Sequence, residues 1–335
     1  MKTLARFFIV TWVCIWPGPA FSTLHEAREV HYQMGTFLEL TLWHSEPEVA
    51  KRIIRETAEE VHRLDEILSN FDPDSSLSRF NQQAGKGKTS LPPELHEILA
   101  IARQFSIMTS GDFDITVGPL MELWRDSSSL GRLPDRDTLS RVLGQVGYEK
   151  LKLYDHRQAE LLHPAMKIDL GGIGKGYAVD RVANRLKTAG VNAALINFGG
   201  SSIYALGTPP GEQGWEIGLQ ATDGRLRGVV YLRDMALSTS GSMGKFWNIG
   251  GKRYGHLIDP KSGMPVLESR MATVITASAT TAEALTKPLV LRGKNALQIV
   301  AQIPQTEAII ISESGPLFFS AGFRSKTRWQ EIPSS

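Results

Sequence analysis

The chain has 335 residues, with 37 Lys and Arg against 35 Asp and Glu and a single cysteine. Its hydrophobic fraction of 42% and charged fraction of 21% are those of an ordinary globular protein, which excludes a disordered chain and a multi-pass membrane protein. A net charge of +2 gives no electrostatic basis for a nucleic-acid partner, and one cysteine excludes an internal disulfide and a cysteine-based zinc site.

The amino terminus has the layout of a secretory signal peptide. Lys2 and Arg6 precede an almost wholly apolar run over 7–16, and helix-breaking and small residues follow it. This run is about half the length that a membrane-spanning helix needs, which is roughly 20 residues. We therefore predict a cleavable signal peptide over 1–22 and an exported, periplasmic domain over 23–335, with a membrane-anchored form as the alternative.

The signal segment also accounts for two features of the composition. Lys2 and Arg6 lie in it and no acidic residue does, so the remaining chain has equal numbers of basic and acidic side chains. Cys14 lies in it as well, behind the bulky Trp12 and Val13, which are unusual before a lipidated cysteine. Lipidation of Cys14 stays open, and the exported domain has no thiol.

Hydrophobic periodicity predicts one α+β domain of mixed sheets flanked by helices. Helical spacing and helix-ending residues predict helices over 47–70, 93–109 and 175–189 and shorter helices near 281–287 and 295–302. Serines, a glycine and a proline predict a surface loop over 126–137. Short β-branched or alternating runs predict strands over 192–198, 202–206, 215–220, 228–233, 271–277 and 306–311. No linker is long enough to separate two domains.

A glycine-rich segment, 169–180, leads from an apolar strand into the helix over 175–189. Free backbone N–H groups at such a helix start suit a phosphate or pyrophosphate, and Lys175 would add positive charge. Gly176 follows the lysine where a P-loop has Ser or Thr, and the spacing is not that of a dinucleotide-binding G-x-G-x-x-G turn. A phosphate site and a tight turn without a ligand both remain open from the residues alone.

Several further segments accompany this turn in a recognisable order: 34–36, 68–81, 110–124, 197–201, 238–241 and 256–263. Together they resemble the ApbE-type FAD:protein FMN transferases over almost all of the chain after residue 22. The resemblance implies the family's α+β fold, FAD as substrate, Mg²⁺ as cofactor and transfer of FMN to a threonine hydroxyl with release of AMP. The implied partner is an exported or membrane acceptor flavoprotein, which would bring the enzyme to the membrane only peripherally.

The resemblance also implies which residues contact FAD. One of them, Asp112, departs from the family pattern, because the family more often has a small residue at this position. The implied positions are Met34 and Phe71 beside the flavin, Asp112, Phe113 and Asp114 in a flavin-contacting tripeptide, Asp169 and Lys175 in the glycine-rich turn, and His256 and Leu257 in a loop that closes over the nucleotide.

Attack of a hydroxyl on phosphorus needs an in-line geometry, neutralised phosphate charge and a base. Histidine suits the last role because its pKa lies near neutrality. We predict that His256, followed by Asp259 in a loop rich in Pro and Gly, is this base. The alternative is that His256 only holds the loop through hydrogen bonds.

The clearest departure from the family concerns the metal. The family site has an Asp followed four residues later by a Thr, and here these positions are Glu283 and Lys287. An ammonium cannot coordinate Mg²⁺, and Pro288 disfavours helical geometry at Lys287. Gly172 and Thr286 are the other candidate ligands.

Three interpretations of this departure are open. Lys287 replaces the charge of the metal; or Glu283 and Thr286 still hold Mg²⁺ with the Gly172 carbonyl while Lys287 points elsewhere; or Glu283 and Lys287 form a surface ion pair worth about 0.3–0.5 kcal/mol. With the metal lost, a non-catalytic periplasmic FAD-binding protein or flavoprotein assembly factor is the alternative to the transferase.

Overall fold

The computed structural model describes residues 23–242, 244–312 and 316–332. The predicted signal peptide over 1–22 therefore lies outside the described residues. Within them, no helix is both long and apolar enough to cross a membrane.

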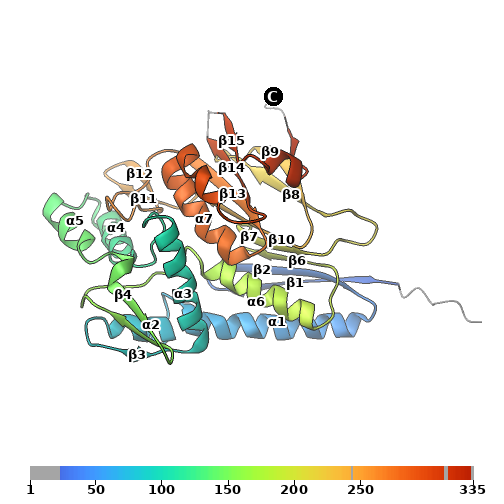
Figure 1. Ribbon diagram of the computed structural model, residues 1–335, viewed down its shortest axis with the longest axis horizontal. Helices are drawn as coiled ribbons and strands as arrows, with labels where there is room; N and C mark the ends of the chain where they lie inside the picture. Colours follow the sequence, from blue (N-terminus) through green and yellow to red (C-terminus); the bar gives the residue numbers. More distant parts are fainter. Residues whose placement is uncertain (1–22, 243, 313–315, 333–335) are drawn as a thin grey trace, which may run out of the picture.

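An eight-stranded antiparallel sheet forms the centre of the molecule (Figure 1). In spatial order its strands are β1 (His25–Gln33), β2 (Thr36–His44), β6 (Ala194–Phe198), β7 (Ser202–Leu206), β10 (Met235–Gly241), β13 (Arg270–Thr276), β14 (Glu307–Ser312) and β15 (Leu317–Phe319). β1 and β2 are joined by a turn of Met34 and Gly35, which have φ of 47° and 72°. Such left-handed pairs match the twist of a hairpin, so Met34 lies at the tip of the β1–β2 hairpin.

Helices cover one face of this sheet. They are α1 (Pro47–Leu68), α3 (Pro93–Met108), α6 (Gly174–Thr188) and α7 (Ala279–Arg292). The apolar sides of α1, α6 and α7 pack on inward-facing strand residues such as Leu40, Ile196 and Val274, and α3 packs against α1 and α7. Figure 1 shows α6 lying alongside α1 beneath the sheet.

A second, smaller sheet covers the opposite face. It consists of β8 (Trp215–Gln220), β9 (Leu226–Leu232) and β16 (Gln330–Glu331), with the short α9 (Phe323–Lys326) beside them. Trp215 and Val230 from this layer pack on Ile203 and Ile309, which alternate along their strands with residues facing the helices. The domain therefore has three layers, with the large sheet in the middle.

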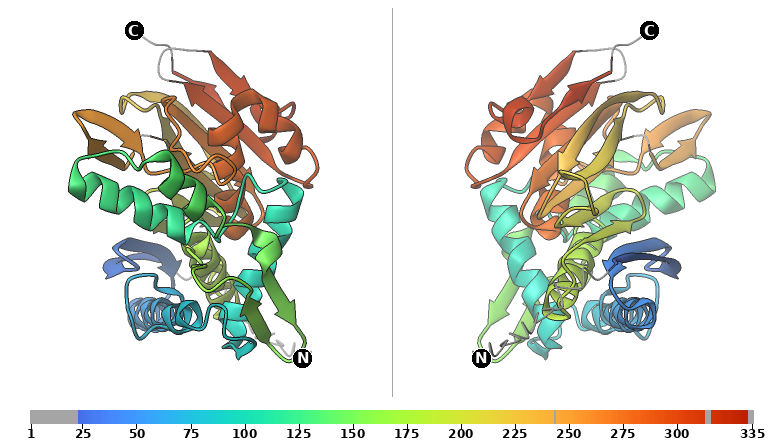
Figure 2. Two further views of the ribbon diagram at one scale, coloured as in Figure 1. Left: turned by 90° about the vertical axis from the view of Figure 1, so that its left-hand side faces the viewer. Right: turned by 90° about the vertical axis from the view of Figure 1, so that its right-hand side faces the viewer.

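Smaller elements extend the end of the molecule where α4 lies. They are α2 (Ser76–Gln82), β3 (Thr89–Ser90), α4 (Gly118–Leu130), α5 (Arg136–Leu143), η1 (Tyr148–Lys150), β4 (Leu151–Tyr154), β5 (Gln158–Leu161), β11 (Phe246–Ile249) and β12 (Lys252–Gly255). The β11–β12 hairpin lies beside α4 (Figure 2). Trp124 of α4 and Trp247 of β11 stack there, with their ring centroids 6.3 Å apart. Two short helices, η2 (Gly293–Ala296) and α8 (Leu297–Val300), follow α7.

Most predicted elements are confirmed, and three expectations are corrected. The α+β class is confirmed, but every pair of named strands is antiparallel rather than mixed, both where a short turn joins the two strands, as in β6 and β7, and where a long segment does, as in β2 and β6. The prediction of a surface loop over 126–137 is wrong at both ends, because 126–130 belong to α4 and 136–137 belong to α5. Helix α7 continues through Pro288, since buried Leu285 and Leu289 anchor both of its flanks.

Helices α6 and α7 cap each other. A Cβ added to Gly176 in the first turn of α6 would lie 2.4 Å from the carbonyl oxygen of Ala279, so only glycine allows this approach. The Asp180 carboxylate of α6 accepts hydrogen bonds of 2.7 and 2.9 Å from the N–H groups of Ala279 and Thr280 at the start of α7. In return, the Glu283 carboxylate of α7 accepts the Gly176 N–H at 2.5 Å. Each helix start thus receives a carboxylate from the other helix.

This close approach gives a test of the packing. We expect Gly176→Ala to lower the free energy of unfolding by about 2 kcal/mol, because overpacking against a backbone atom forces the two helices apart. Urea denaturation measures this change. The control is Gly244→Ala, whose added Cβ meets nothing within 4 Å and should change stability by less than about 0.5 kcal/mol. Equal stabilities of the two variants would contradict the tight contact.

Candidate functional site

The glycine-rich turn before α6 is held by its own first residue. The N–H of Asp169 donates to the Ile115 carbonyl at 2.7 Å, and its carboxylate accepts the Gly171 N–H at 2.7 Å. Burial raises the pKa of Asp169 above its ordinary value, although the hydrogen bond from Gly171 opposes the shift. The Met34 side chain packs against this turn from the β1–β2 hairpin, since its Cε is 3.8 Å from a Cβ built on Gly174.

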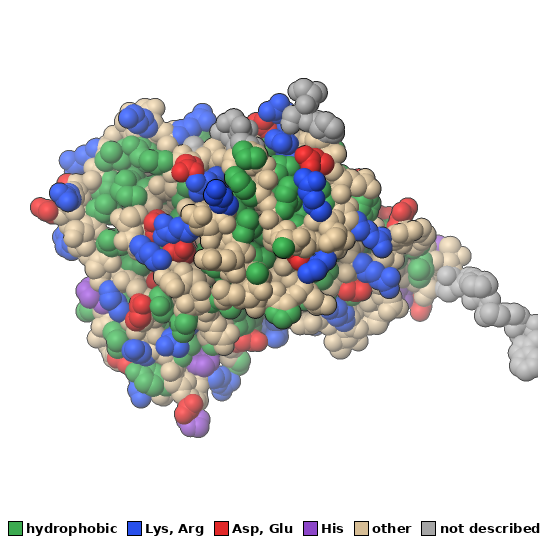
Figure 3. Space-filling model, turned by 45° about the horizontal axis from the view of Figure 1, so that its top comes forward, with side chains coloured by type: hydrophobic (Ala, Val, Ile, Leu, Met, Phe, Trp, Pro, Cys, Tyr) green, Lys and Arg blue, Asp and Glu red, His purple; other side chains and the backbone are tan. Residues whose placement is uncertain are grey.

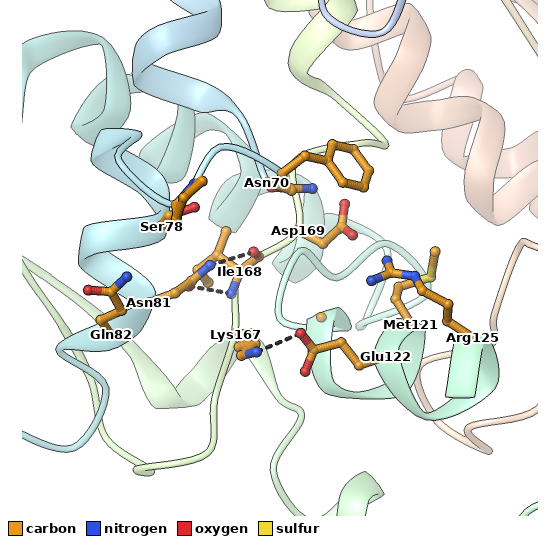
Figure 4. A pocket seen from close by; sticks show the side chains of 13 residues that line it. Asn70, Ser78, Asn81, Gln82, Met121, Glu122, Arg125, Lys167, Ile168 and Asp169 are labelled. Carbon is orange, nitrogen blue, oxygen red and sulfur yellow. Dashed lines mark hydrogen bonds and ion pairs between the residues drawn. The ribbon is translucent and has the colours of Figure 1, made fainter. Parts of the chain in front are cut away.

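Asp169 also lines a cavity of about 300 Å³ that opens beside the turn. Figure 4 shows its carboxylate facing the guanidinium of Arg125 across this cavity, with Asn70 beside it. Phe71, predicted to lie beside the flavin, is 83% exposed at the rim of the cavity. The structure thus brings Phe71 and Asp169 together and adds Arg125, which the sequence analysis did not single out.

On the other side of the turn, Lys175 pairs with Glu283. The Lys175 ammonium lies 2.7 Å from one carboxylate oxygen of Glu283, and the second oxygen accepts the Gly176 N–H. The Glu283 side chain is only 2% exposed. Burial opposes ionisation of this carboxyl, but the positive charges of Lys175 and Lys287 outweigh burial and hold its pKa below the ordinary value.

Lys287 turns its ammonium back along α7 and into the site. Its Nζ donates to the backbone carbonyl of Glu283 at 3.0 Å and to the hydroxyls of Thr286 and Ser240, each at 3.3 Å. Its Cε would be 3.1 Å from a Cβ built on Gly172. Burial lowers the pKa of Lys287 to about 8, with the Glu283 charge opposing the shift.

These positions decide between the interpretations of Lys287. A surface ion pair with Glu283 is wrong, because the Glu283 carboxylate is buried and pairs with Lys175. Lys287 does not point elsewhere either, since it lies among the oxygens that were expected to hold a metal. The remaining interpretation is a cationic side chain at the metal position.

A divalent cation does not fit this arrangement. Mg²⁺ requires oxygen ligands at about 2.0–2.1 Å in octahedral geometry. Here the Thr286 hydroxyl donates to the Glu283 carbonyl at 2.7 Å, and an ammonium lies 3.3 Å from it.

His256 lies close to this cationic cluster. Its Nδ1 is 2.9 Å from the backbone carbonyl of Lys245, which only accepts, so Nδ1 carries the proton and Nε2 is left with a free lone pair. Burial lowers the pKa of His256 below its ordinary value; the hydrogen bond to Lys245 opposes this, and the charges of Lys245, Lys287 and Lys175 add to it. The imidazole is therefore neutral and able to accept a proton at pH 7.

A network of ion pairs fastens the His256 loop to α7. Arg292, at the end of α7, donates to Asp112 at 2.8 and 3.1 Å and to Asp259 at 3.0 and 3.1 Å. Lys261 reaches Asp112 at 2.6 Å. Burial opposes ionisation of Asp112, but the hydrogen bonds from Arg292 and Lys261 outweigh it and hold its pKa below the ordinary value. Arg292 and Lys261 are further residues that the sequence analysis missed.

The remaining predicted residues are buried beneath the site. Phe113 is 3% exposed and packs edge-on against Phe105, and Leu257 is 7% exposed. The Asp114 carboxylate accepts hydrogen bonds from Thr116 and from the Tyr148 N–H, and burial raises its pKa. Phe113 also lies against the glycine-rich turn, since its ring is 3.7 Å from a Cβ built on Gly172. Contact with the flavin stays a prediction for all three residues.

On the surface, Lys and Arg side chains lie interspersed with Asp and Glu over the face turned forward in Figure 3. This distribution agrees with the balanced charge of the chain after residue 22 and offers no extended basic surface on this face.

Comparison with solved structures defines the class of the fold. The ApbE protein of Thermotoga maritima superposes with a TM-score of 0.80 at 27% identity and covers 91% of this chain and 100% of that chain. The apo flavinyl transferase ApbE of Pseudomonas stutzeri superposes with a TM-score of 0.79 at 26% identity and covers 91% of this chain and 97% of that chain. The fold is that of the ApbE-type flavin transferases.

Sequence comparison agrees with the structural one. The FAD:protein FMN transferase of Treponema pallidum is 26% identical over 328 residues, which cover 91% of this chain and 90% of the relative. That of Klebsiella pneumoniae is 26% identical over 290 residues, which cover 84% and 83%. The model of the ApbE family matches residues 34–310. The chain belongs to the ApbE family.

The Asp112 network gives a test based on pH. Because folding lowers the pKa of Asp112, its stabilising effect is present above the unfolded value near 4 and is lost as the pH falls through the folded pKa. We expect Asp112→Asn to lower the free energy of unfolding by about 1–2 kcal/mol at pH 7. The expected loss is not larger because Lys261 is half-exposed, so solvent weakens its pairing with Asp112.

Urea denaturation between pH 7 and pH 3 measures this difference, which should shrink below about pH 4. The control is Asp223→Asn, because Asp223 pairs with the exposed Arg225 and its loss should change stability less than Asp112→Asn does. A difference between Asp112→Asn and the unsubstituted protein that stays constant across this range would contradict the network.

Proposed function

We propose that this protein is an FAD:protein FMN transferase that attaches FMN through its phosphate to a threonine of an acceptor protein. The observation that carries the proposal is the placement of a neutral, lone-pair-bearing His256 beside Lys175, Lys287 and the glycine-rich turn. A base and fixed positive charge are what phosphoryl transfer from FAD requires. Membership of the ApbE family supports FAD as the substrate.

The chemistry follows from these groups. The threonine oxygen attacks the FMN-side phosphorus of FAD, the bond from that phosphorus to the bridging oxygen breaks, and AMP leaves. Nε2 of His256 takes the hydroxyl proton, while Lys175 and Lys287 stabilise the charge that grows on the phosphate oxygens. The cavity between Phe71, Asp169 and Arg125 is open enough to admit an aromatic ring system beside the turn.

The acceptor and the compartment are further parts of the proposal. A signal peptide over 1–22 would export the protein to the periplasm, where its acceptor would be an exported or membrane redox protein. The domain then needs no membrane segment of its own, because the acceptor supplies any contact with the membrane. Mg²⁺ has no step in this mechanism, since Lys287 lies among the oxygens expected to bind it.

One observation favours a second candidate, a non-catalytic FAD-binding protein or assembly factor. The Glu283 carboxylate already pairs with the Lys175 ammonium and accepts the Gly176 N–H, two groups that a pyrophosphate at this turn would use. A pyrophosphate must therefore either share these donors or displace the carboxylate. The following assay separates binding from transfer.

Incubation of the protein with FAD and a candidate acceptor domain should produce flavin fluorescence that survives denaturing electrophoresis. One AMP should appear for each FMN attached, because the pyrophosphate bond is the one that breaks. An acceptor whose target threonine is replaced by valine is the control. FAD that binds tightly without any covalent flavin on the acceptor would contradict the transferase and support the second candidate.

His256 gives a more specific test. We expect His256→Gln to reduce the rate of transfer by about 10²–10⁴-fold while FAD affinity is retained, since the change removes the base but keeps a polar side chain. With the unsubstituted protein, the rate should be level above about pH 6.5 and fall at lower pH, because the pKa of His256 is lowered and the base is lost on protonation.

Single-turnover measurements across pH provide both readouts. His62→Gln is the matched control, because this histidine lies on the exposed face of α1 and should leave the rate unchanged. A rate for His256→Gln equal to that of the unsubstituted protein would show that His256 only holds its loop.

A further inference from the structure

We propose that the Lys287 ammonium supplies the positive charge that a divalent cation would otherwise provide beside the pyrophosphate, so that this protein binds FAD without metal. The proposal rests on the proposed function for the identity of the ligand. It assigns Lys287 as a substrate-binding residue, so that lysine side chains supply the positive charge beside the pyrophosphate.

The first support is the position of the ammonium. Its hydrogen-bond acceptors are the Glu283 carbonyl and the hydroxyls of Thr286 and Ser240, all of them neutral oxygens. Within the described part of the chain, Lys287 makes no ion pair, because the carboxylate of Glu283 is held by Lys175 and Gly176. The site therefore holds two lysine charges against one carboxylate, and the surplus charge attracts an anion.

The second support is the access that Gly172 gives. A side chain at this position would meet Lys287, since its Cβ would be 3.1 Å from the Cε of the lysine. Glycine leaves the ammonium next to the turn whose backbone N–H groups suit a phosphate. The two hydroxyl contacts of 3.3 Å are long, so a phosphate oxygen can replace one of them without any backbone change.

The third support is the length of Glu283. Its extra methylene, relative to Asp, lets a carboxylate on α7 reach the first turn of α6 and bind Gly176 and Lys175 there. A carboxylate used in this way is unavailable to a metal ion. Where the family has two metal ligands, this chain thus has Glu283, which caps α6, and Lys287, which carries a positive charge.

FAD titrations monitored by flavin fluorescence, in EDTA and in MgCl₂, test this directly. We expect the unsubstituted protein to bind FAD with equal affinity, within about twofold, in both buffers. Lys287→Met should weaken FAD binding at least tenfold in both, and Lys294→Met, which removes an exposed lysine of η2, should not change it. The double variant Glu283→Asp/Lys287→Thr should bind FAD at least tenfold more tightly in MgCl₂ than in EDTA.

The outcomes separate this proposal from the proposed function. FAD binding by the unsubstituted protein that is lost in EDTA and restored by Mg²⁺ would overturn the proposal, even if transfer to an acceptor occurs. Metal-independent FAD binding together with no transfer would uphold the proposal and contradict the transferase. If a Lys287 variant fails to fold by circular dichroism, the two titrations of the unsubstituted protein still decide the question.

Discussion

The reciprocal capping of α6 and α7 is the constraint on which the site depends. Gly176 lets the two helix starts meet, Asp180 satisfies the first N–H groups of α7, and Glu283 satisfies the Gly176 N–H of α6. Each carboxylate lies at the positive end of a helix dipole. The contact fixes the glycine-rich turn, which precedes α6, relative to the part of α7 that carries Lys287.

Electrostatics of the site follow from this constraint. With Glu283 committed to the cap and to Lys175, Lys287 is left to hydroxyl and carbonyl oxygens, and its charge faces the turn. The same positive charges help to keep His256 neutral, which gives the proposed mechanism its base. One arrangement of Lys175, Glu283 and Lys287 thus caps a helix and places positive charge where the proposed phosphate binding and proton acceptance need it.

Much of the fold could be predicted from the sequence, because buried elements carry strong periodicity. Helix α1 and strand β7 end within two residues of the prediction, since their apolar positions repeat regularly and glycine or polar residues follow. Strand β1 was missed because it is a largely exposed edge strand, rich in charge and without a clear apolar face. Helix α4 was missed because consecutive serines obscured its last turn, which ends at a left-handed Gly131.

The candidate site could be predicted only in part. The segments that resemble the family located the glycine-rich turn and His256, but the partner of Glu283 could not be inferred, because Gly176 is separated from it by 107 positions. Arg292 was missed for the same reason, since it joins Asp112 and Asp259 only after the chain has folded. Local spacing suggested an i,i+4 ion pair of Glu283 and Lys287. In the structure, Glu283 instead binds Lys175 and Gly176, and Lys287 donates to oxygens that include the distant Ser240 hydroxyl.

A crystal structure of the FAD complex grown with Mn²⁺ would show whether a lysine or a metal ion lies beside the pyrophosphate, because Mn²⁺ scatters anomalously and takes the place of Mg²⁺ at oxygen ligands. We expect the Lys287 Nζ to lie within about 3 Å of a pyrophosphate oxygen, with no anomalous peak between Gly172 and Thr286. An anomalous peak at that position, with the Lys287 side chain turned away from the pyrophosphate, would contradict it.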